Sequence, residues 1–128
     1  MIDQAGILMA QGLGIASERI QGVNDNMSQS HYHEYYEIYY LEAGERFHMV
    51  EDQLYKMEAG EFMIFPPYVM HHSYGEENIP FKRLLLYFKP EEILWPSVRD
   101  ALKEESGIYR TDIKKRQEIH RVMEDILK

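Results

Sequence analysis

The feature that most constrains the fold is a succession of short apolar segments between residues 31 and 89, each followed by polar turn residues. Ala43-Gly44-Glu45 and Glu58-Ala59-Gly60-Glu61 separate such segments, and Pro66-Pro67 ends another because proline cannot donate to a central strand ladder. Strands of this length and spacing are typical of a β-sandwich or β-barrel. The predicted strands cover residues 35–42, 46–51, 54–57, 62–65, 72–74 and 81–88.

The sequence on either side of this region follows other patterns, so the chain divides into three parts. Residues 1–26 are rich in Gly and Gln, which predicts an N-terminal arm with at most one short strand, at residues 16–23. Residues 27–89 are the predicted barrel. In residues 90–128 the apolar period changes from two to about 3.6 residues, which predicts a pair of helices.

The two C-terminal helices have recognisable start and stop signals. Pro90 and Pro96 precede the first, which ends at Ser106-Gly107, and the second begins near Thr111-Asp112. The second carries an apolar stripe that needs a partner surface, either the barrel or a second copy of the chain. Because no stop signal follows this stripe, we expect the natural polypeptide to continue beyond Lys128. The stripe consists of Ile119, Val122, Met123, Ile126 and Leu127.

Composition excludes several classes of function. The 14 Lys and Arg against 22 Asp and Glu give a formal charge of −8, so this segment alone is not expected to bind DNA. The basic residues 114–116 are interpreted as a solvated helix face. The absence of cysteine excludes disulfides and thiolate sites. No membrane helix or secretory signal is predicted, because polar residues interrupt every long apolar run, and we expect a cytoplasmic location.

The densest group of chemically active side chains lies in residues 31–39. If this segment is an unbroken strand, residues of equal parity share one face, which gathers two imidazoles, one carboxylate and two phenols. A third imidazole comes from His71 or His72, just after the proline pair. Nitrogen and oxygen donors of this kind suit a zinc, nickel, manganese or iron ion. The gathered residues are His31, His33, Tyr35, Glu37 and Tyr39.

The spacing of these residues resembles the two motifs of the cupin family. The first motif reads H-x-H, three or four residues, E, six residues, G. The second reads G, five residues, P-x-G, two residues, H, and here Tyr68 replaces the inner glycine. The positions that match are His31, His33, Glu37 and Gly44 in the first motif and Gly60, Pro66 and His71 in the second. This resemblance implies a possible metal site formed by His31, His33, Glu37 and His71.

A longer resemblance, over residues 28–92, is to the N-terminal sensor domain of AraC-type regulators. It is carried by HYHEYYEIYYLEAGE, GEFMIFPPYVMHHSY and FKRLLLYF. The resemblance implies a mainly β fold, a cupin or double-stranded β-helix (jelly-roll) barrel, followed by two α-helices that carry a homodimer contact. It further implies a DNA-binding helix-turn-helix domain that this sequence lacks. Many such barrels bind an organic effector without metal, and the His and Glu positions then serve as polar contacts.

We therefore predict a binding module for a small polar metabolite rather than an enzyme. Dense tyrosines beside a carboxylate are also typical of sugar sites. One alternative is a stand-alone metal-dependent cupin enzyme of the dioxygenase or isomerase type. A further alternative is a structural interaction domain with a filled barrel. The expected ligand contacts are His33, Tyr35, Glu37, Tyr39 and His71.

Some other side chains receive structural interpretations. Arg83 is either an anchor for an anionic effector at the barrel mouth or an edge residue whose guanidinium reaches solvent. His48 and His120 are predicted to be surface residues or polar residues with partners. We expect Tyr36, Ile38 and Tyr40 to form the outer face of their strand. The predicted core contains Phe47, Met49, Phe62, Ile64, Leu84 and Leu86.

Overall fold

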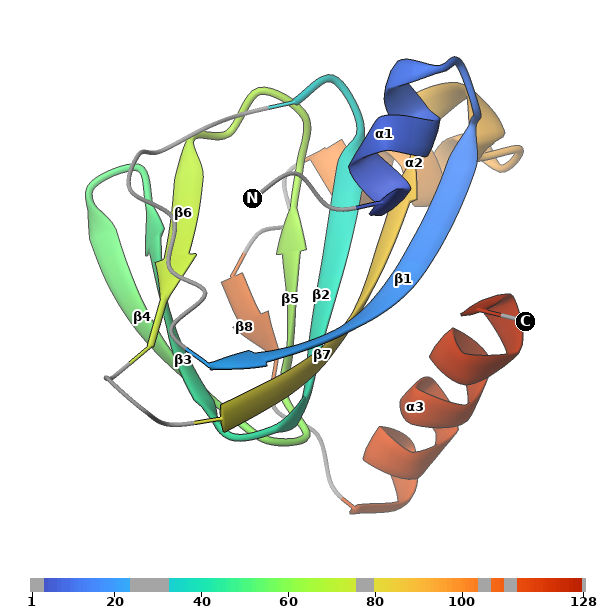
Figure 1. Cartoon of the computed structure of the whole chain (residues 1–128). Helices are drawn as coiled ribbons and strands as arrows, with labels where there is room; N and C mark the ends of the chain where they lie inside the picture. The colour runs from blue at the N-terminus through green and yellow to red at the C-terminus, as the bar shows by residue number, and fades with distance from the viewer. Residues whose placement is uncertain (1–3, 24–32, 76–79, 104–106, 110–112, 128) are drawn as a thin grey trace.

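Two antiparallel sheets that face each other form the body of the fold (Figure 1). The computed structural model describes residues 4–23, 33–75, 80–103, 107–109 and 113–127. The larger sheet has the strand order β1-β7-β2-β5-β8 and the smaller has the order β4-β3-β6. This arrangement confirms the predicted mainly β, jelly-roll architecture.

The strands agree closely with the predicted ones. Strand β5 has the predicted bounds, because a glycine turn precedes it and Pro66 follows it. The larger sheet contains β1 (Ile15–Val23), β7 (Pro80–Phe88), β2 (Tyr36–Ala43), β5 (Phe62–Phe65) and β8 (Gly107–Tyr109). The smaller contains β4 (Gln53–Glu58), β3 (Glu45–Val50) and β6 (His71–Tyr74). The short strand β8 pairs with β5 and was not predicted.

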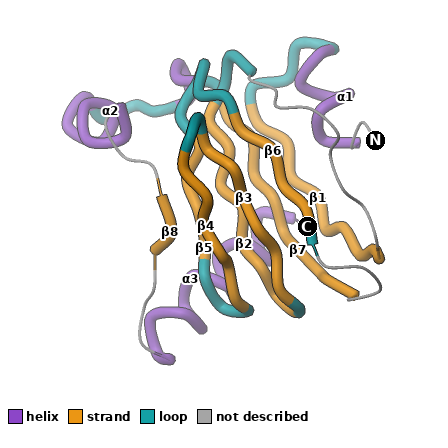
Figure 2. The backbone as a smooth tube through the Cα atoms, turned by 90° about the vertical axis from the view of Figure 1, so that its left-hand side faces the viewer, coloured by secondary structure: helices purple, strands orange, loops and turns teal. Residues whose placement is uncertain are grey.

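The helices lie outside the two sheets (Figure 2). A single 3-10 turn (Pro90–Glu92) precedes α2 (Pro96–Lys103), and α3 (Ile113–Leu127) lies along the larger sheet. This confirms the predicted helices after residue 90. No helix in the described part of the chain is long and apolar enough to cross a membrane.

Helix α1 (Gln4–Ala10) was not predicted, since its sequence is short and contains glycine. A seven-residue helix is unstable alone, so its contacts with the sheet stabilise it. Ala5 and Met9 are almost fully buried, and the Ala5 backbone N–H donates to the Glu18 carboxylate at 2.9 Å. The helix therefore depends on tertiary contacts that the local sequence does not reveal.

Strand β3 directs its polar residues into the space between the sheets. Arg46 and His48 are 2% and 1% exposed, whereas Phe47 and Met49 are only half-buried. The prediction that Phe47 and Met49 belong to the core is therefore wrong. So is the prediction that His48 is a surface residue or a polar residue with partners, because it is buried and neither ring nitrogen has a hydrogen-bond partner among the described residues. The physical reason is the register with β6, which pairs His48 with the buried Ser73, so that polar residues of both strands share the inner face.

The outer face of the larger sheet is covered by α3. Tyr40, Leu84, Leu86 and Met123 form a buried cluster there, with Ile38 among the half-buried residues packed against it. This confirms the predicted outer position of Ile38 and Tyr40 and the burial of Leu84 and Leu86. Part of the apolar stripe of α3 therefore packs on the sheet.

Ionic contacts also hold α3 to the sheet. The Arg19 guanidinium bonds to Glu42 at 2.8 Å and to Glu124 at 2.7 Å, and His120 Nε2 lies 2.5 Å from Glu42 Oε2. Burial opposes ionisation of Glu42, but Arg19 and His120 outweigh it and hold the pKa of this carboxyl below its usual value. His120 is thus a polar residue with partners, as predicted.

Candidate functional site

Two imidazoles and one carboxylate meet at one end of the space between the sheets. His33 Nε2 lies 3.1 Å from Glu37 Oε1, and His71 Nε2 lies 3.4 Å from the same oxygen. Glu37 and His71 are 4% and 2% exposed. Glu37 belongs to β2, His71 begins β6 and His33 lies just before β2, so both sheets contribute to this group, which we call the mouth cluster.

Backbone carbonyls orient both imidazoles of the mouth cluster. His33 Nδ1 lies 3.0 Å from the Tyr35 carbonyl oxygen and His71 Nδ1 lies 2.9 Å from that of Val69. A carbonyl only accepts hydrogen bonds, so each Nδ1 carries a proton and donates. In a neutral imidazole the Nε2 atom that faces Glu37 is then an acceptor. Either extra protons on the imidazoles or a cation must therefore compensate the charge of Glu37.

Glu37 is ionised in this environment. Burial raises the pKa of its carboxyl, but the hydrogen bonds and charges of His33 and His71 outweigh burial and hold the pKa well below the usual range. A buried carboxylate between two oriented imidazoles is a strong anionic centre. It can accept hydrogen bonds from a guest or share in binding a cation.

The mouth cluster fits a divalent metal. Its three donor atoms lie within 4.8 Å of one another. Ligands at about 2.1 Å from a metal are about 3.0 Å apart in octahedral and about 3.4 Å apart in tetrahedral geometry, close to the two distances above. The oriented Nδ1–H groups are also typical of metal-binding imidazoles. Zinc, nickel, manganese or iron would be held by His33, Glu37 and His71, while the fourth predicted ligand, His31, lies outside the described residues.

The turn at Tyr68 positions His71 beside Glu37. Tyr68 has a φ of 67°, the left-handed conformation that glycine adopts most readily, so the turn keeps its shape without glycine. The Tyr68 backbone N–H donates to the His33 carbonyl at 2.9 Å, which ties the two segments that carry the imidazoles. His72 points elsewhere and stacks with Tyr74 at 6.0 Å. The third imidazole is therefore His71.

Farther from the mouth, the interior contains polar side chains that lack partners. Tyr39 is 1% exposed, and its hydroxyl makes no hydrogen bond of normal geometry within the described part of the chain, although Arg83 and Arg46 lie near enough to act on it electrostatically. Both ring nitrogens of His48 are likewise without a partner, and its ring lies edge-on to Tyr39 at 4.5 Å. Burial lowers the pKa of His48 to about 3, so this imidazole is neutral. We call Tyr39, His48 and Arg83, described next, the deep group.

Arg83 lies on the inner face of β7. It is 5% exposed, which contradicts the interpretation of an edge residue that reaches solvent. Its guanidinium carbon is 5.0 Å from the centre of the Tyr39 ring and 5.9 Å from that of Phe81. The guanidinium carbon of Arg46, in β3 of the smaller sheet, lies 4.2 Å from the centre of the Phe81 ring in the larger sheet. The same guanidinium donates to the Ser73 hydroxyl at 3.2 Å. Arginines from both sheets therefore approach this part of the interior.

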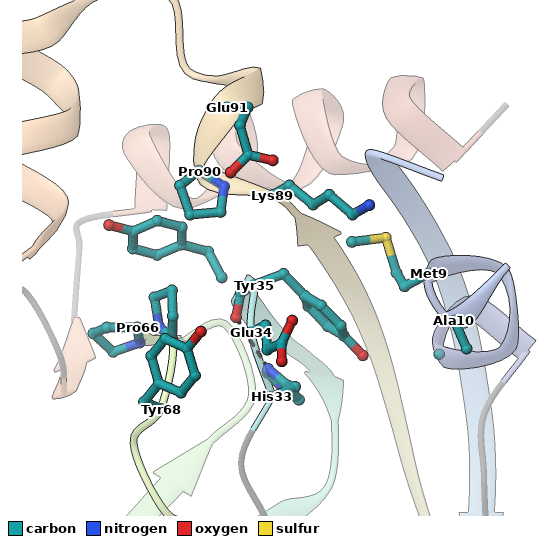
Figure 3. A pocket seen from close by; sticks show the side chains of 13 residues that line it. Met9, Ala10, His33, Glu34, Tyr35, Pro66, Tyr68, Lys89, Pro90 and Glu91 are labelled. Atoms are coloured by element: carbon teal, nitrogen blue, oxygen red, sulfur yellow. Dashed lines mark hydrogen bonds between the residues drawn. The ribbon is translucent and has the colours of Figure 1, made fainter. Parts of the chain in front are cut away.

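A pocket of about 810 Å³ opens beside the mouth cluster (Figure 3). His33 lies at its base near Tyr35 and Glu34, whereas Lys89 and Glu91 lie across from them. Helix α1 closes one side, and the proline turn with Tyr68 forms another wall. Lining residues that the sequence did not indicate include Met9, Glu34, Tyr68, Lys89 and Glu91.

The predicted ligand contacts occupy two levels of the interior. Tyr35 stacks on His33 at 4.3 Å, so it joins Glu37 and His71 at the mouth. Tyr39 lies deeper, two residues along β2 from Glu37. Sequence reasoning missed His48, although its alternation with Arg46 in β3 is a signal of a polar inner face.

Comparisons with solved structures reveal a shared fold at low sequence identity. A cupin protein from Bacteroides fragilis aligns with a TM-score of 0.58 and 16% identity, over 77% of this chain and 80% of that one. An RmlC-like cupin family protein from Methanocaldococcus jannaschii gives 0.53 and 17%, over 59% and 70%. Oxalate decarboxylase from Bacillus subtilis, which has Mn(II) centres, gives 0.52 and 18%, over 62% of this chain and 22% of its own.

Sequence comparison identifies the family. No curated protein matches the chain. A sequence model of the AraC-like ligand binding domain matches residues 15–127, which include every described strand and α3. The chain therefore belongs to the family of AraC-like ligand-binding domains, built on the cupin fold.

Proposed function

We propose that this domain senses a small polar effector for an AraC-type transcription regulator. The observation that carries the proposal is the deep group, because Tyr39 and His48 bury three polar atoms that have no hydrogen-bond partner among the residues that the structure describes. Each such atom costs about 1–3 kcal/mol of folding stability. A domain with a purely structural role gains nothing from these groups, whereas a guest that hydrogen-bonds to them recovers the loss.

The effector enters through the pocket at the mouth and extends inward. It contacts His33, Tyr35 and Glu37 first and then Tyr39, with His71 on the opposite sheet. Glu37 accepts hydrogen bonds, which favours a guest with hydroxyl or amine groups, such as a sugar or a related metabolite. Aromatic rings on both sides suit the flat faces of such a guest.

Effector binding regulates the protein by favouring one arrangement of the elements near the pocket. Helix α1 lines the pocket, and α3 packs on the other side of β2. A guest changes their positions only if its contacts differ between the two arrangements. Homodimerisation through the C-terminal helices and DNA binding by a further domain complete the proposal. The exposed Val122 and Ile126 of α3 are in keeping with the homodimer contact.

Thermal denaturation with sugars, small acids and divalent ions tests the proposal. A true ligand at 100 times its Kd stabilises the fold by about 2.7 kcal/mol, so the melting temperature rises saturably. The Glu37→Gln and Tyr39→Phe variants are expected to reduce this rise. Tyr40→Phe is the matched control, because Tyr40 lies on the outer face. Equal rises in all three variants would contradict binding in the interior.

A second candidate is a metal-dependent cupin enzyme, favoured by the three converging donors of the mouth cluster. A metal there would act as a Lewis acid toward a substrate oxygen. The Mn(II) centres of the structurally similar oxalate decarboxylase lend this reading some weight. One equivalent of tightly bound metal after gentle purification, together with a turnover that His71→Ala abolishes, would favour the enzyme over the sensor.

A further inference from the structure

We infer that the effector is an organic anion with a single negative charge, whose carboxylate binds Arg83 in the deep group. The inference rests on the proposed function and specifies the class of effector. It starts from a guanidinium that is almost fully buried and faces the space between the sheets.

Arg83 has no counterion within the described part of the chain. The described residues form no ion pair with it, and its Nε atom is buried without a hydrogen-bond partner among them, although Tyr39, Glu37 and Tyr87 attract its charge across the interior. Its contacts are the faces of Tyr39 and Phe81. Rings attract a cation but much less strongly than a carboxylate does once both are removed from water. Burial opposes the charge of Arg83, and its surroundings outweigh burial and hold its pKa above the usual value, but none of them is a carboxylate in contact with it. An anionic guest would therefore add an ion pair that the described residues do not supply.

The buried carboxylates nearby are already committed. Glu37 lies between His33 and His71 at the mouth. Glu61 lies in the turn before β5 and accepts the Glu58 backbone N–H at 2.7 Å. Neither forms an ion pair with Arg83, and Glu37 attracts it only at longer range, so the guanidinium can still pair with the carboxylate of a guest.

The position of Arg83 along β7 defines the length and polarity of the guest. Tyr87 pairs with Glu37 and Arg83 pairs with Leu41, so the mouth cluster and Arg83 are four residues apart, about 13 Å along the strand. A guest that spans this distance would contact the Glu37 carboxylate with its end at the mouth and the Arg83 guanidinium with its inner end. Neutral His48 and Tyr39 lie between them. A hydroxy acid or sugar acid has this polarity, with hydroxyls toward Glu37 and its carboxylate toward Arg83.

Paired probes separate the anion from its neutral scaffold. The melting temperature and binding isotherms are measured with gluconate against glucose, with inorganic phosphate as a dianion. We expect the acid to raise the melting temperature saturably and its neutral partner to have little effect. Arg83→Met should weaken binding of the acid about 10- to 100-fold, while Arg83→Lys retains part of it. Tyr40→Phe, on the outer face, should bind like the wild type.

The outcomes distinguish this inference from the proposed function. Equal stabilisation by the neutral partner, or acid binding that survives in Arg83→Met, overturns the anionic assignment and leaves an interior sensor site intact. If the Tyr39→Phe and Arg83→Met variants both bind every probe like the wild type, the proposal of a binding site in the interior is itself contradicted. If no probe binds, the test is the melting temperature of the Arg83→Met variant in the absence of any ligand. A melting temperature above that of the wild type supports a guanidinium kept for a guest, and a lower one overturns the inference.

Discussion

Side chains of the same kind differ in their hydrogen-bond partners on the two faces of strand β2. Tyr39 and Tyr40 are consecutive, yet the Tyr39 hydroxyl is buried without a partner, whereas Tyr40 stacks on His120 at 5.3 Å and lies 3.5 Å from the Arg116 carbonyl. Glu42 on the outer face likewise has both an arginine and a histidine. In the described part of the chain, the outer polar groups of β2 are paired with other residues of the protein, whereas several inner polar groups have no hydrogen-bond partner.

The largest expected effect tests the outer face. Met123→Ala removes a 6% exposed side chain from the cluster beneath α3 and should lower the free energy of unfolding by about 2–5 kcal/mol. Chemical denaturation measures this change. Val122→Ala, on an exposed position of the same helix, is the control and should change stability by less than about 0.5 kcal/mol. Similar losses in both variants would show that α3 does not pack as described.

The second effect concerns His48 on the inner face and depends on pH. Because burial lowers the pKa of His48 from 6.5 to about 3, its stability contribution is complete above pH 6.5 and declines as the pH falls toward 3. Between pH 7 and pH 5 the wild type should therefore lose about 2 kcal/mol more than His48→Gln. Urea denaturation at the two pH values measures the difference. Parallel losses in the two proteins would mean that His48 takes up a proton in the folded state.

A smaller effect compares the two neighbouring tyrosines directly. Tyr39→Phe deletes a buried hydroxyl without a partner and should stabilise the effector-free protein by about 1 kcal/mol. Tyr40→Phe deletes one long hydrogen bond and should cost about 0.5 kcal/mol. Urea denaturation measures the free energy of unfolding of both variants, and the test is that the two changes have opposite signs. Destabilisation by Tyr39→Phe would mean that the inner hydroxyl already has a structural partner.

The smallest effect concerns backbone strain at the mouth. Tyr68→Gly relieves a left-handed conformation that costs other residues about 1–2 kcal/mol, but glycine loses about 0.5–1 kcal/mol in chain entropy. The net stabilisation should be a few tenths of a kcal/mol. Glu51→Gly, at a φ of 54° in the β3–β4 turn, is the matched control and should gain as much. Only Tyr68→Gly should alter effector binding, because Tyr68 lines the pocket.

Local signals in the sequence predicted the elements with clear boundaries. Strand β5 lies between a glycine turn and two prolines, and α3 has a continuous apolar stripe, so both could be found from the sequence. Helix α1 and strand β8 depend on contacts with distant residues and have no such signal.

The candidate site was predictable in part. Motif spacing indicated His33, Glu37 and His71, which the structure brings together. The inner position of His48 was missed because hydrophobicity favoured Phe47 and Met49 as the buried pair. The alternation of Arg46 with His48 was a signal of a polar inner face, but the pairing of β3 with β6 decides which face is buried, and that pairing cannot be read from β3 alone.

The alternation of side chains along β2 has one further consequence. Glu37 and Tyr39 face the interior while Ile38, Tyr40 and Glu42 face α3, so a single strand separates the polar interior from the helix. A slight rotation of this strand about its long axis would displace both sets of side chains at once. A displacement caused by a guest in the interior would then reach α3 through the stiff backbone of β2 itself, without a relay of side chains.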